Sequence, residues 1–170
     1  DLASSAYNER RAECEAAVVK LQGLRGGLIS LRDADPELLE AARGDLSPGE
    51  MKRARHVVTE NERVQRTAAA LRAGDGRLAG RLLKESHDSL RDDYEVSGKE
   101  LDLLVDISME QAGVLGARLT GAGFGGCVVA LVMAVVAERE RDAIVRWYRR
   151  STGRDAAAYV CTPGPGATIL

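Results

Sequence analysis

Residues 115–137 read LGARLTGAGFGGCVVALVMAVVA and place a glycine-rich loop between two strand-like runs. Four of the six residues at positions 121–126 are glycine, so the backbone there can adopt positive φ values without a clash at Cβ. Bare N–H groups in such a loop can form a concave nest whose partial positive charge suits a phosphate. A tight turn between two strands explains the same glycines. Spacing alone favours the turn and leaves the phosphate loop open.

The loop lacks the marks of the two most common phosphate-binding motifs. No Lys-Ser or Lys-Thr follows Gly126, as a Walker-type loop requires. The residues after Gly126 look like a strand, whereas the dinucleotide-binding pattern opens a helix at that point. If a phosphate lies at this loop, backbone geometry and N–H donors would be its contribution.

The sequence before this stretch predicts a series of helices. Apolar residues recur at three- and four-residue steps over 7–24, 51–71, 78–90 and 101–109. A short helix is expected at 36–43, where a proline occupies the first helical position. Each apolar stripe is about one face wide, so these helices should pack on another layer.

Helix start signals support these boundaries. Asp35 and Ser47 each precede a proline, and Glu50 completes a capping box with Ser47. Ser97 and Glu100 repeat the same spacing. We therefore expect Ser97 to cap the helix that follows it.

Strand signals come late, at residues 114–120, 127–136, 156–161 and 167–170, with a helix expected at 138–150. Residues 127–136 are apolar at every position, as in a central strand covered on both faces or tightly packed at one. Helices first, then strands around one helix, predict an α+β fold in which helices cover a small antiparallel sheet of four strands.

The composition excludes several classes of protein. A length of 170 residues suits one domain with a sizeable core. The net charge of −2, the pI near 5.8 and the single Trp and Phe give no support for a nucleic-acid partner. The longest apolar run, residues 127–137, is too short to cross a bilayer, so no membrane partner is expected.

Cysteine and histidine usage gives the expected compartment and excludes a common metal site. Three scattered cysteines, an odd number, do not suggest a disulfide framework, and a cytoplasmic location is expected. Two histidines without a cysteine pair at ligand spacing give no support for zinc. The sequence predicts that His56 lies on a helix surface and that His87 is structural.

Residues 116–131, which contain the loop, resemble the third conserved motif of the galactokinases, a group within the GHMP small-molecule kinases. Further blocks resemble galactokinase segments and occur in the expected order. The resemblance covers nearly the whole chain and fades after about Val135. These blocks are LASSAYNERRAECE at 2–15, RARHVV at 53–58, ESHDSLRDDYEVS at 85–97 and ELDLLV at 100–105.

The resemblance implies a fold and a domain organisation. It implies a ferredoxin-like GHMP kinase C-terminal domain over residues 1–170, with extra N-terminal helices. Galactokinases also carry an Arg-containing sugar motif and a second glycine- and serine-rich nucleotide loop, and nothing here matches either. The chain opens on Asp1 and not on methionine. We therefore expect the C-terminal domain alone, without the N-terminal nucleotide-binding domain.

The resemblance also implies an activity. Galactokinases transfer the γ-phosphoryl group of MgATP to α-D-galactose and release galactose 1-phosphate. Galactose, ATP and the absent N-terminal domain would be the partners of this chain. The catalytic residues and the Mg²⁺ ligands are expected in that absent domain, so no catalytic residue or metal ligand is assigned here.

The site residues carried over from the resemblance lie in two places. Tyr7 would contact galactose, because its phenol can donate and accept hydrogen bonds. The loop at 121–126 would lie beside the transferred phosphate. Ala122 is expected to keep an ordinary φ, because a positive φ is costly for alanine. The loop residues are Gly121, Ala122, Gly123, Phe124, Gly125 and Gly126.

Two other functions remain open from the sequence. Some galactokinase-like proteins are non-catalytic galactose sensors, and the residues that discriminate them lie outside this chain. A GHMP kinase for another small alcohol is the other alternative, although the blocks at 2–15 and 85–97 look particular to galactokinases.

Three acidic residues near the end of one expected helix have no assigned role. Asp92, Asp93 and Glu95 could hold a divalent cation. A solvent-facing acidic helix end explains them better. Because acids at a helix C-terminus oppose its dipole, Arg91 or a neighbouring helix should compensate their charge.

Overall fold

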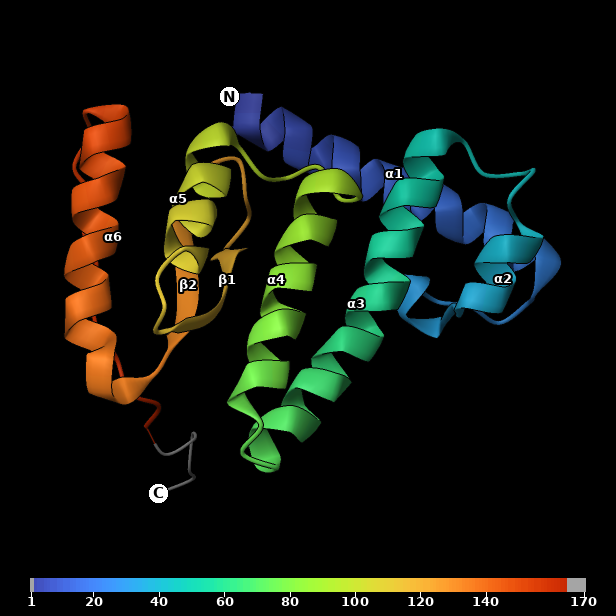
Figure 1. The fold of residues 1–170 in the computed structure, drawn as a ribbon. Coiled ribbons are helices and arrows are strands. Elements are labelled where there is room, and N and C mark those ends of the chain that lie inside the picture. The colour runs from blue at the N-terminus through green and yellow to red at the C-terminus, as the bar shows by residue number, and fades with distance from the viewer. Residues whose placement is uncertain (1, 165–170) are drawn as a thin grey trace, which may run out of the picture.

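The computed structural model describes residues 2–164, and the side chains of residues 5–164. The predicted α+β class is confirmed: six α-helices and a two-stranded antiparallel sheet form the described part of the chain (Figure 1). In chain order the elements are α1 (Leu2–Leu24), η1 (Leu31–Asp33), α2 (Pro36–Ala41), α3 (Pro48–Arg72), α4 (Gly76–Asp92), α5 (Lys99–Met109), β1 (Val114–Thr120), β2 (Cys127–Val132), η2 (Ala134–Val136) and α6 (Ala137–Thr152).

Helix capping follows the sequence at two of three predicted starts. The Asp35 side chain accepts a hydrogen bond from the Leu38 N–H at the start of α2. Ser47 and Glu50 form the predicted capping box at α3. The prediction for Ser97 was wrong, because Gly98 is the N-cap of α5. The Ser97 hydroxyl instead donates to Asp102 at 2.5 Å, within the first turn of that helix.

The described helices pack around two hydrophobic cores, and α3 and α4 lie side by side between them (Figure 1). One core lies among α1, α2 and α3 and includes Ala17, Leu21, Leu39 and Val58. A second, smaller core joins the end of α4, the α4–α5 connection, α5 and β1. It consists of Leu90, Val96, Leu101 and Leu119, with Tyr94, Phe124 and Val128 packed against it. Helix α6 contacts α5 at the other side of the molecule.

Helix α4 runs alongside β1 and covers the edge that β2 leaves free. The two backbones come close at Gly80 and Gly116: a Cβ built on Gly80 would lie 2.0 Å from the Leu115 carbonyl oxygen. Further along, the Leu119 N–H donates to Nδ1 of His87 at 3.3 Å. His87 is fully buried, as a structural role requires. Two glycines therefore allow α4 to pack directly against the backbone of β1.

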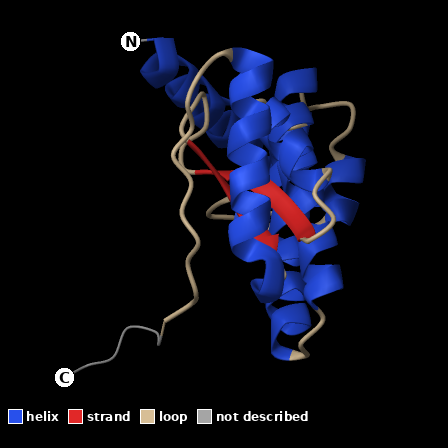
Figure 2. Ribbon diagram, turned by 60° about the vertical axis from the view of Figure 1, so that its left-hand side comes forward, coloured by secondary structure: helices blue, strands red, loops and turns tan. Residues whose placement is uncertain are grey.

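The sheet is smaller than the sequence predicted. Strands β1 and β2 pair in antiparallel register from Thr120↔Cys127 to Val114↔Val132. The predicted four-stranded sheet is not formed among the described residues, because 156–161 form no strand there. They lie mostly exposed in an extended loop after α6 (Figure 2), where no strand edge supplies hydrogen bonds. Residues 167–170 lie outside the described part.

Strand β2 is also shorter and more exposed than expected. It ends at Val132, and residues 134–136 form a 3₁₀ turn that leads into α6. Val129 is 47% exposed, so β2 is not covered on both faces, the first of the two predicted alternatives; Val128, on its other face, packs against the second core. β1 is the single strand partner of β2 among the described residues, so β2 is an edge strand there and not the predicted central strand.

His56 was predicted on a helix surface but is buried between α3 and α4. Its Nδ1 lies 2.9 Å from the Ser89 hydroxyl, and its ring stacks on Tyr94 with centroids 4.6 Å apart. Burial disfavours the charged imidazolium and lowers the pKa of His56 to about 4. The ring is therefore neutral in the folded protein at neutral pH.

No described helix is both long and apolar enough to cross a membrane.

We expect Gly80→Ala to lower the free energy of unfolding by about 1–3 kcal/mol, because the new Cβ would meet backbone atoms that cannot move aside cheaply. Gly23→Ala is the matched control, since a Cβ there meets nothing within 4 Å and alanine favours a helix. Urea unfolding followed by circular dichroism measures both. A Gly80→Ala protein as stable as the wild type would mean that α4 does not rest on β1 in this way.

Stability should rise with pH between about 4 and 6.5. The unfolded chain binds a proton at His56 near pH 6.5, whereas the folded protein resists it until about pH 4. Stability from this group is therefore present above pH 6.5 and is lost as the pH falls toward 4, by at most about 3 kcal/mol. Urea titrations across this range should show the slope, and His56→Gln should reduce it. A His56→Gln protein with an unchanged slope would refute the assignment.

Candidate functional site

The predicted sugar-contacting residue lies on the first third of α1. Tyr7 is 51% exposed, so its phenol is accessible on the surface of the chain. One turn later, Arg10 lies 4.0 Å from Glu95 of the α4–α5 connection. Further along, the Cys14 thiol lies 3.9 Å from the Tyr94 hydroxyl. The helix that carries Tyr7 therefore contacts the connection between α4 and α5.

The glycine-rich loop joins β1 to β2, and most of its residues have positive φ. Ala122 does not, as predicted from its Cβ. Phe124 does, and its side chain packs against the second core. The positive values are +90° at Gly121, +83° at Gly123, +59° at Phe124, +135° at Gly125 and +107° at Gly126.

One point of this loop is fixed against the α4–α5 connection. The Phe124 N–H donates to the Val96 carbonyl oxygen at 2.7 Å. A Cβ built on Gly123 would lie 2.3 Å from that same oxygen, so only glycine fits there. At Gly121, Gly125 and Gly126 a Cβ would meet nothing within 4 Å. The loop is therefore anchored in its middle and open on either side of the anchor.

Residues 93–96 form the turn on which the loop rests, and we call them the 93–96 turn. Its Val96 N–H returns to the Leu90 carbonyl at 3.0 Å, and Glu95 adopts a φ of +55°. Arg53 of α3 contacts this turn, and its side chain is only 3% exposed. Its guanidinium donates to the Asp93 carbonyl oxygen and, at 2.7 Å, to Glu95.

The three acids without an assigned role each face a cation. Asp92 accepts two hydrogen bonds from Arg91, both at 2.8 Å, and Asp93 lies 3.0 Å from Arg55. The predicted compensation by Arg91 and a neighbouring helix is therefore confirmed. No cluster of metal-ligating side chains occurs among the described residues, and these acids serve ion pairs.

Glu95 is the most strongly stabilised of these carboxylates. It accepts from Lys52 at 2.5 Å and from Arg53 at 2.7 Å. These hydrogen bonds, Lys52 first, lower the pKa of Glu95 to about 2. The carboxylate therefore stays ionised at any pH at which the protein is expected to work.

Sequence reasoning missed Arg53 and the 93–96 turn as parts of the site. Arg53 opens one of the blocks quoted above, but its partners lie about 40 residues away along the chain. No helical or strand periodicity links such distant positions. No sequence signal pointed to Arg53, because it precedes Ala54 of the apolar stripe and adjacent residues do not share a helix face.

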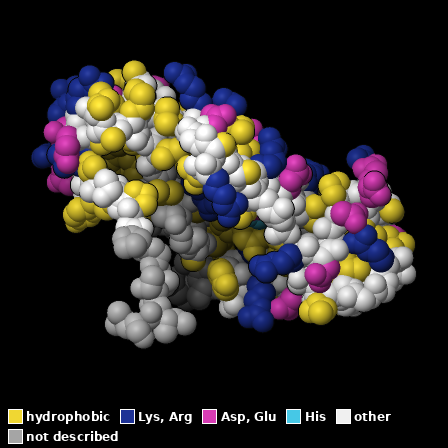
Figure 3. All heavy atoms as spheres, turned by 90° about the horizontal axis from the view of Figure 1, so that it is seen from below, with side chains coloured by type: hydrophobic (Ala, Val, Ile, Leu, Met, Phe, Trp, Pro, Cys, Tyr) yellow, Lys and Arg dark blue, Asp and Glu magenta, His cyan; other side chains and the backbone are white. Residues whose placement is uncertain are grey.

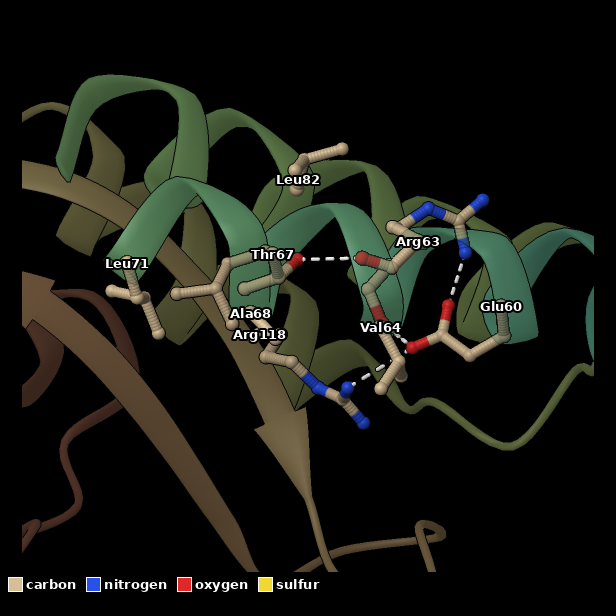
Figure 4. Close-up of a pocket in the computed structure, with 10 residues that line it drawn as sticks. Glu60, Arg63, Val64, Thr67, Ala68, Leu71, Leu82 and Arg118 are labelled. Carbon is tan, nitrogen blue, oxygen red and sulfur yellow. Dashed lines mark hydrogen bonds and ion pairs between the residues drawn. The ribbon is translucent and has the colours of Figure 1, made fainter. Parts of the chain in front are cut away.

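A hollow of about 240 Å³ lies elsewhere, between α3 and α4 (Figure 4). Its polar side is a network in which Glu60 faces Arg63, Arg118 and the Ser86 hydroxyl. Its other walls are apolar, and neither Tyr7 nor the loop lines it. On the face seen in Figure 3, acidic and basic side chains are interspersed and form no single-sign patch.

Comparison with known protein families identifies a domain that this chain resembles. Residues 67–150 match the family described as GHMP kinases C terminal. The chain is 50% identical over 165 residues to galactokinase from Roseiflexus sp. (strain RS-1), covering 97% of this chain and 42% of that protein. It is 47% identical to galactokinase from Homo sapiens, covering 99% of this chain and 41% of that protein.

A solved structure is similar over the same extent. The crystal structure of Lactococcus lactis galactokinase complexed with galactose matches with a TM-score of 0.87 and 44% sequence identity, covering 98% of this chain and 43% of that chain. This chain thus spans about two fifths of the length of the relatives it matches. It is homologous to the C-terminal portion of the galactokinases and belongs with them to the GHMP kinases.

Proposed function

We propose that this chain is the C-terminal domain, residues 1–170, of an enzyme that transfers the γ-phosphoryl group of ATP to α-D-galactose and releases galactose 1-phosphate. The observation that carries the proposal is similarity along 98% of the chain to a galactokinase solved with galactose. Mg²⁺ would enter with ATP as its counterion. A cytoplasmic setting is part of the proposal, because the three cysteines are free thiols.

On the phosphate side, the loop at 121–126 supplies geometry and N–H donors. Among the described residues, Phe124 is the loop residue whose N–H has a backbone acceptor. The neighbouring amides and the open space at Gly125 and Gly126 suit a phosphate oxygen that approaches the nest. Donors fixed before the reaction stabilise developing charge without reorganising. This role requires no proton transfer by the loop.

On the sugar side, Tyr7 supplies a hydroxyl that can donate to or accept from a sugar hydroxyl. Its exposure leaves the phenol accessible. The Arg10–Glu95 contact brings its helix to the same turn that holds the loop. One wall of a cleft would thus carry a sugar contact and a phosphate contact. The catalytic Asp, the sugar-binding Arg, the nucleotide loop and the Mg²⁺ ligands are assigned to the rest of the enzyme.

The direct test is a phosphoryl-transfer assay on a protein of galactokinase length in which this chain forms the C-terminal part. We expect galactose-dependent ADP release, with little from N-acetylgalactosamine or mevalonate. The isolated 170-residue chain should release none. Galactose binding without ADP release would favour a sensor, and preference for another alcohol would favour a different GHMP kinase. Either result would overturn the proposal.

Tyr7→Phe in that protein should weaken galactose use and leave the KM for ATP nearly unchanged. Phenylalanine keeps the ring and removes the hydroxyl, so about 0.5–1.5 kcal/mol of transition-state binding should be lost. This corresponds to a few-fold to about tenfold lower kcat/KM for galactose. Tyr159→Phe, at an 83% exposed position after α6, is the control. Unchanged galactose kinetics in a folded Tyr7→Phe enzyme would remove Tyr7 from the site.

A further inference from the structure

Both parts of the proposed site rest on the same support, the 93–96 turn. The loop touches it through the Phe124 N–H and the Val96 carbonyl, 2.7 Å apart. Helix α1, which carries Tyr7, touches it through Arg10 and Glu95. Any group that fixes the turn therefore fixes the loop and the sugar-side helix relative to each other.

Lys52 also contacts Glu95, but its side chain is 41% exposed, and Arg53 is the buried group that fixes the turn. Its guanidinium joins α3 to two other parts of the chain: Glu13 of α1 at 2.7 Å, and the 93–96 turn through Glu95 at 2.7 Å and the Asp93 carbonyl oxygen. Because the side chain is almost completely buried, each N–H that loses its partner would be left without water to replace it. The planar guanidinium also sets the directions of its bonds, which an ammonium group does not.

Adjacent residues of the 93–96 turn connect Arg53 to the loop. Glu95 holds an unusual φ of +55°, and the next residue presents its carbonyl oxygen to the loop. At Gly123 a Cβ would lie 2.3 Å from that oxygen, so the loop and the turn are in contact without any intervening side chain. A small shift at Glu95 must therefore move the loop or break its anchoring hydrogen bond.

We propose that Arg53 is a positioning residue for phosphoryl transfer, which holds the loop at 121–126 in place through Glu95, the Asp93 carbonyl and Val96. The inference rests on the proposed function for its catalytic consequence, and on this chain alone for its structural part. Arg53 does not touch the substrates. It acts on them through the backbone of the turn.

The structural part is tested by amide hydrogen exchange on this chain. In Arg53→Met, the exchange rate of the Phe124 N–H should rise about tenfold more than the exchange rate of the Met133 N–H. The Met133 N–H donates to the Gly113 carbonyl oxygen at the far end of the sheet. Arg55→Met is the matched control, because Arg55 is 52% exposed and its ion pair within the described part of the chain is with the side chain of Asp93. Equal acceleration at both amides, or the same effect in Arg55→Met, would reduce Arg53 to general stability and overturn the proposal.

The catalytic part is tested by kinetics of a galactokinase-length protein that carries the chain. Arg53→Met should lower kcat by about tenfold to a hundredfold while the KM for galactose changes less than about threefold. Arg53→Lys keeps the charge and should restore stability more than kcat, because it lacks the planar fork. Wild-type kcat per folded molecule in Arg53→Met would contradict the proposal.

The proposed function and the positioning role of Arg53 can fail independently. If the wild-type protein does not phosphorylate galactose, the proposed function fails, while amide exchange still decides whether Arg53 fixes the loop. If Arg53→Met does not fold, Glu95→Ala gives the same two readouts, because Glu95 is 39% exposed and the buried Arg53 keeps the carboxylate of Glu13 as a partner. A Glu95→Ala protein with unchanged kcat and unchanged Phe124 exchange would then refute the proposal.

Discussion

The structure depends most on the buried guanidinium of Arg53. A buried cation is tolerated only when its charge and its N–H groups are satisfied. Arg53 meets this condition by joining α1, α3 and the α4–α5 connection, which are far apart in the sequence. This arrangement is sensitive to mutation, since the loss of any one partner leaves a buried N–H group without an acceptor. The glycine-rich loop then takes its position from the turn that Arg53 holds.

Close backbone contact is the second constraint, and glycine makes it possible at two places. Gly80 and Gly116 let α4 pack directly against the backbone of β1. Gly123 lets the loop rest directly on Val96. In both cases a Cβ would meet backbone atoms, which cannot rotate away as a side chain can. These contacts connect the sheet to the helices on one side and to the proposed phosphate site on the other.

Local signals predicted local structure well. The capping residues at Asp35 and Ser47, the apolar stripes of the helices and the ordinary φ of Ala122 were read correctly. The errors at His56, in the size of the sheet and in the support of the loop have a common cause. Burial of His56 depends on packing between two helices, strand formation at 156–161 depends on an available sheet edge, and the Arg53 contacts join residues about 40 positions apart. None of these is encoded in the neighbouring residues.

The central claim is that the loop is anchored on the 93–96 turn by one hydrogen bond that only glycine at position 123 permits. The most direct measurement is the scalar coupling across that bond, between the Phe124 amide nitrogen and the Val96 carbonyl carbon, in the isotope-labelled chain. The account predicts a resolved coupling in the wild type and its loss in Gly123→Val, while the coupling from Met133 to Gly113 persists in both. A Phe124 coupling that is absent when the Met133 coupling is resolved, or that survives Gly123→Val, would contradict it.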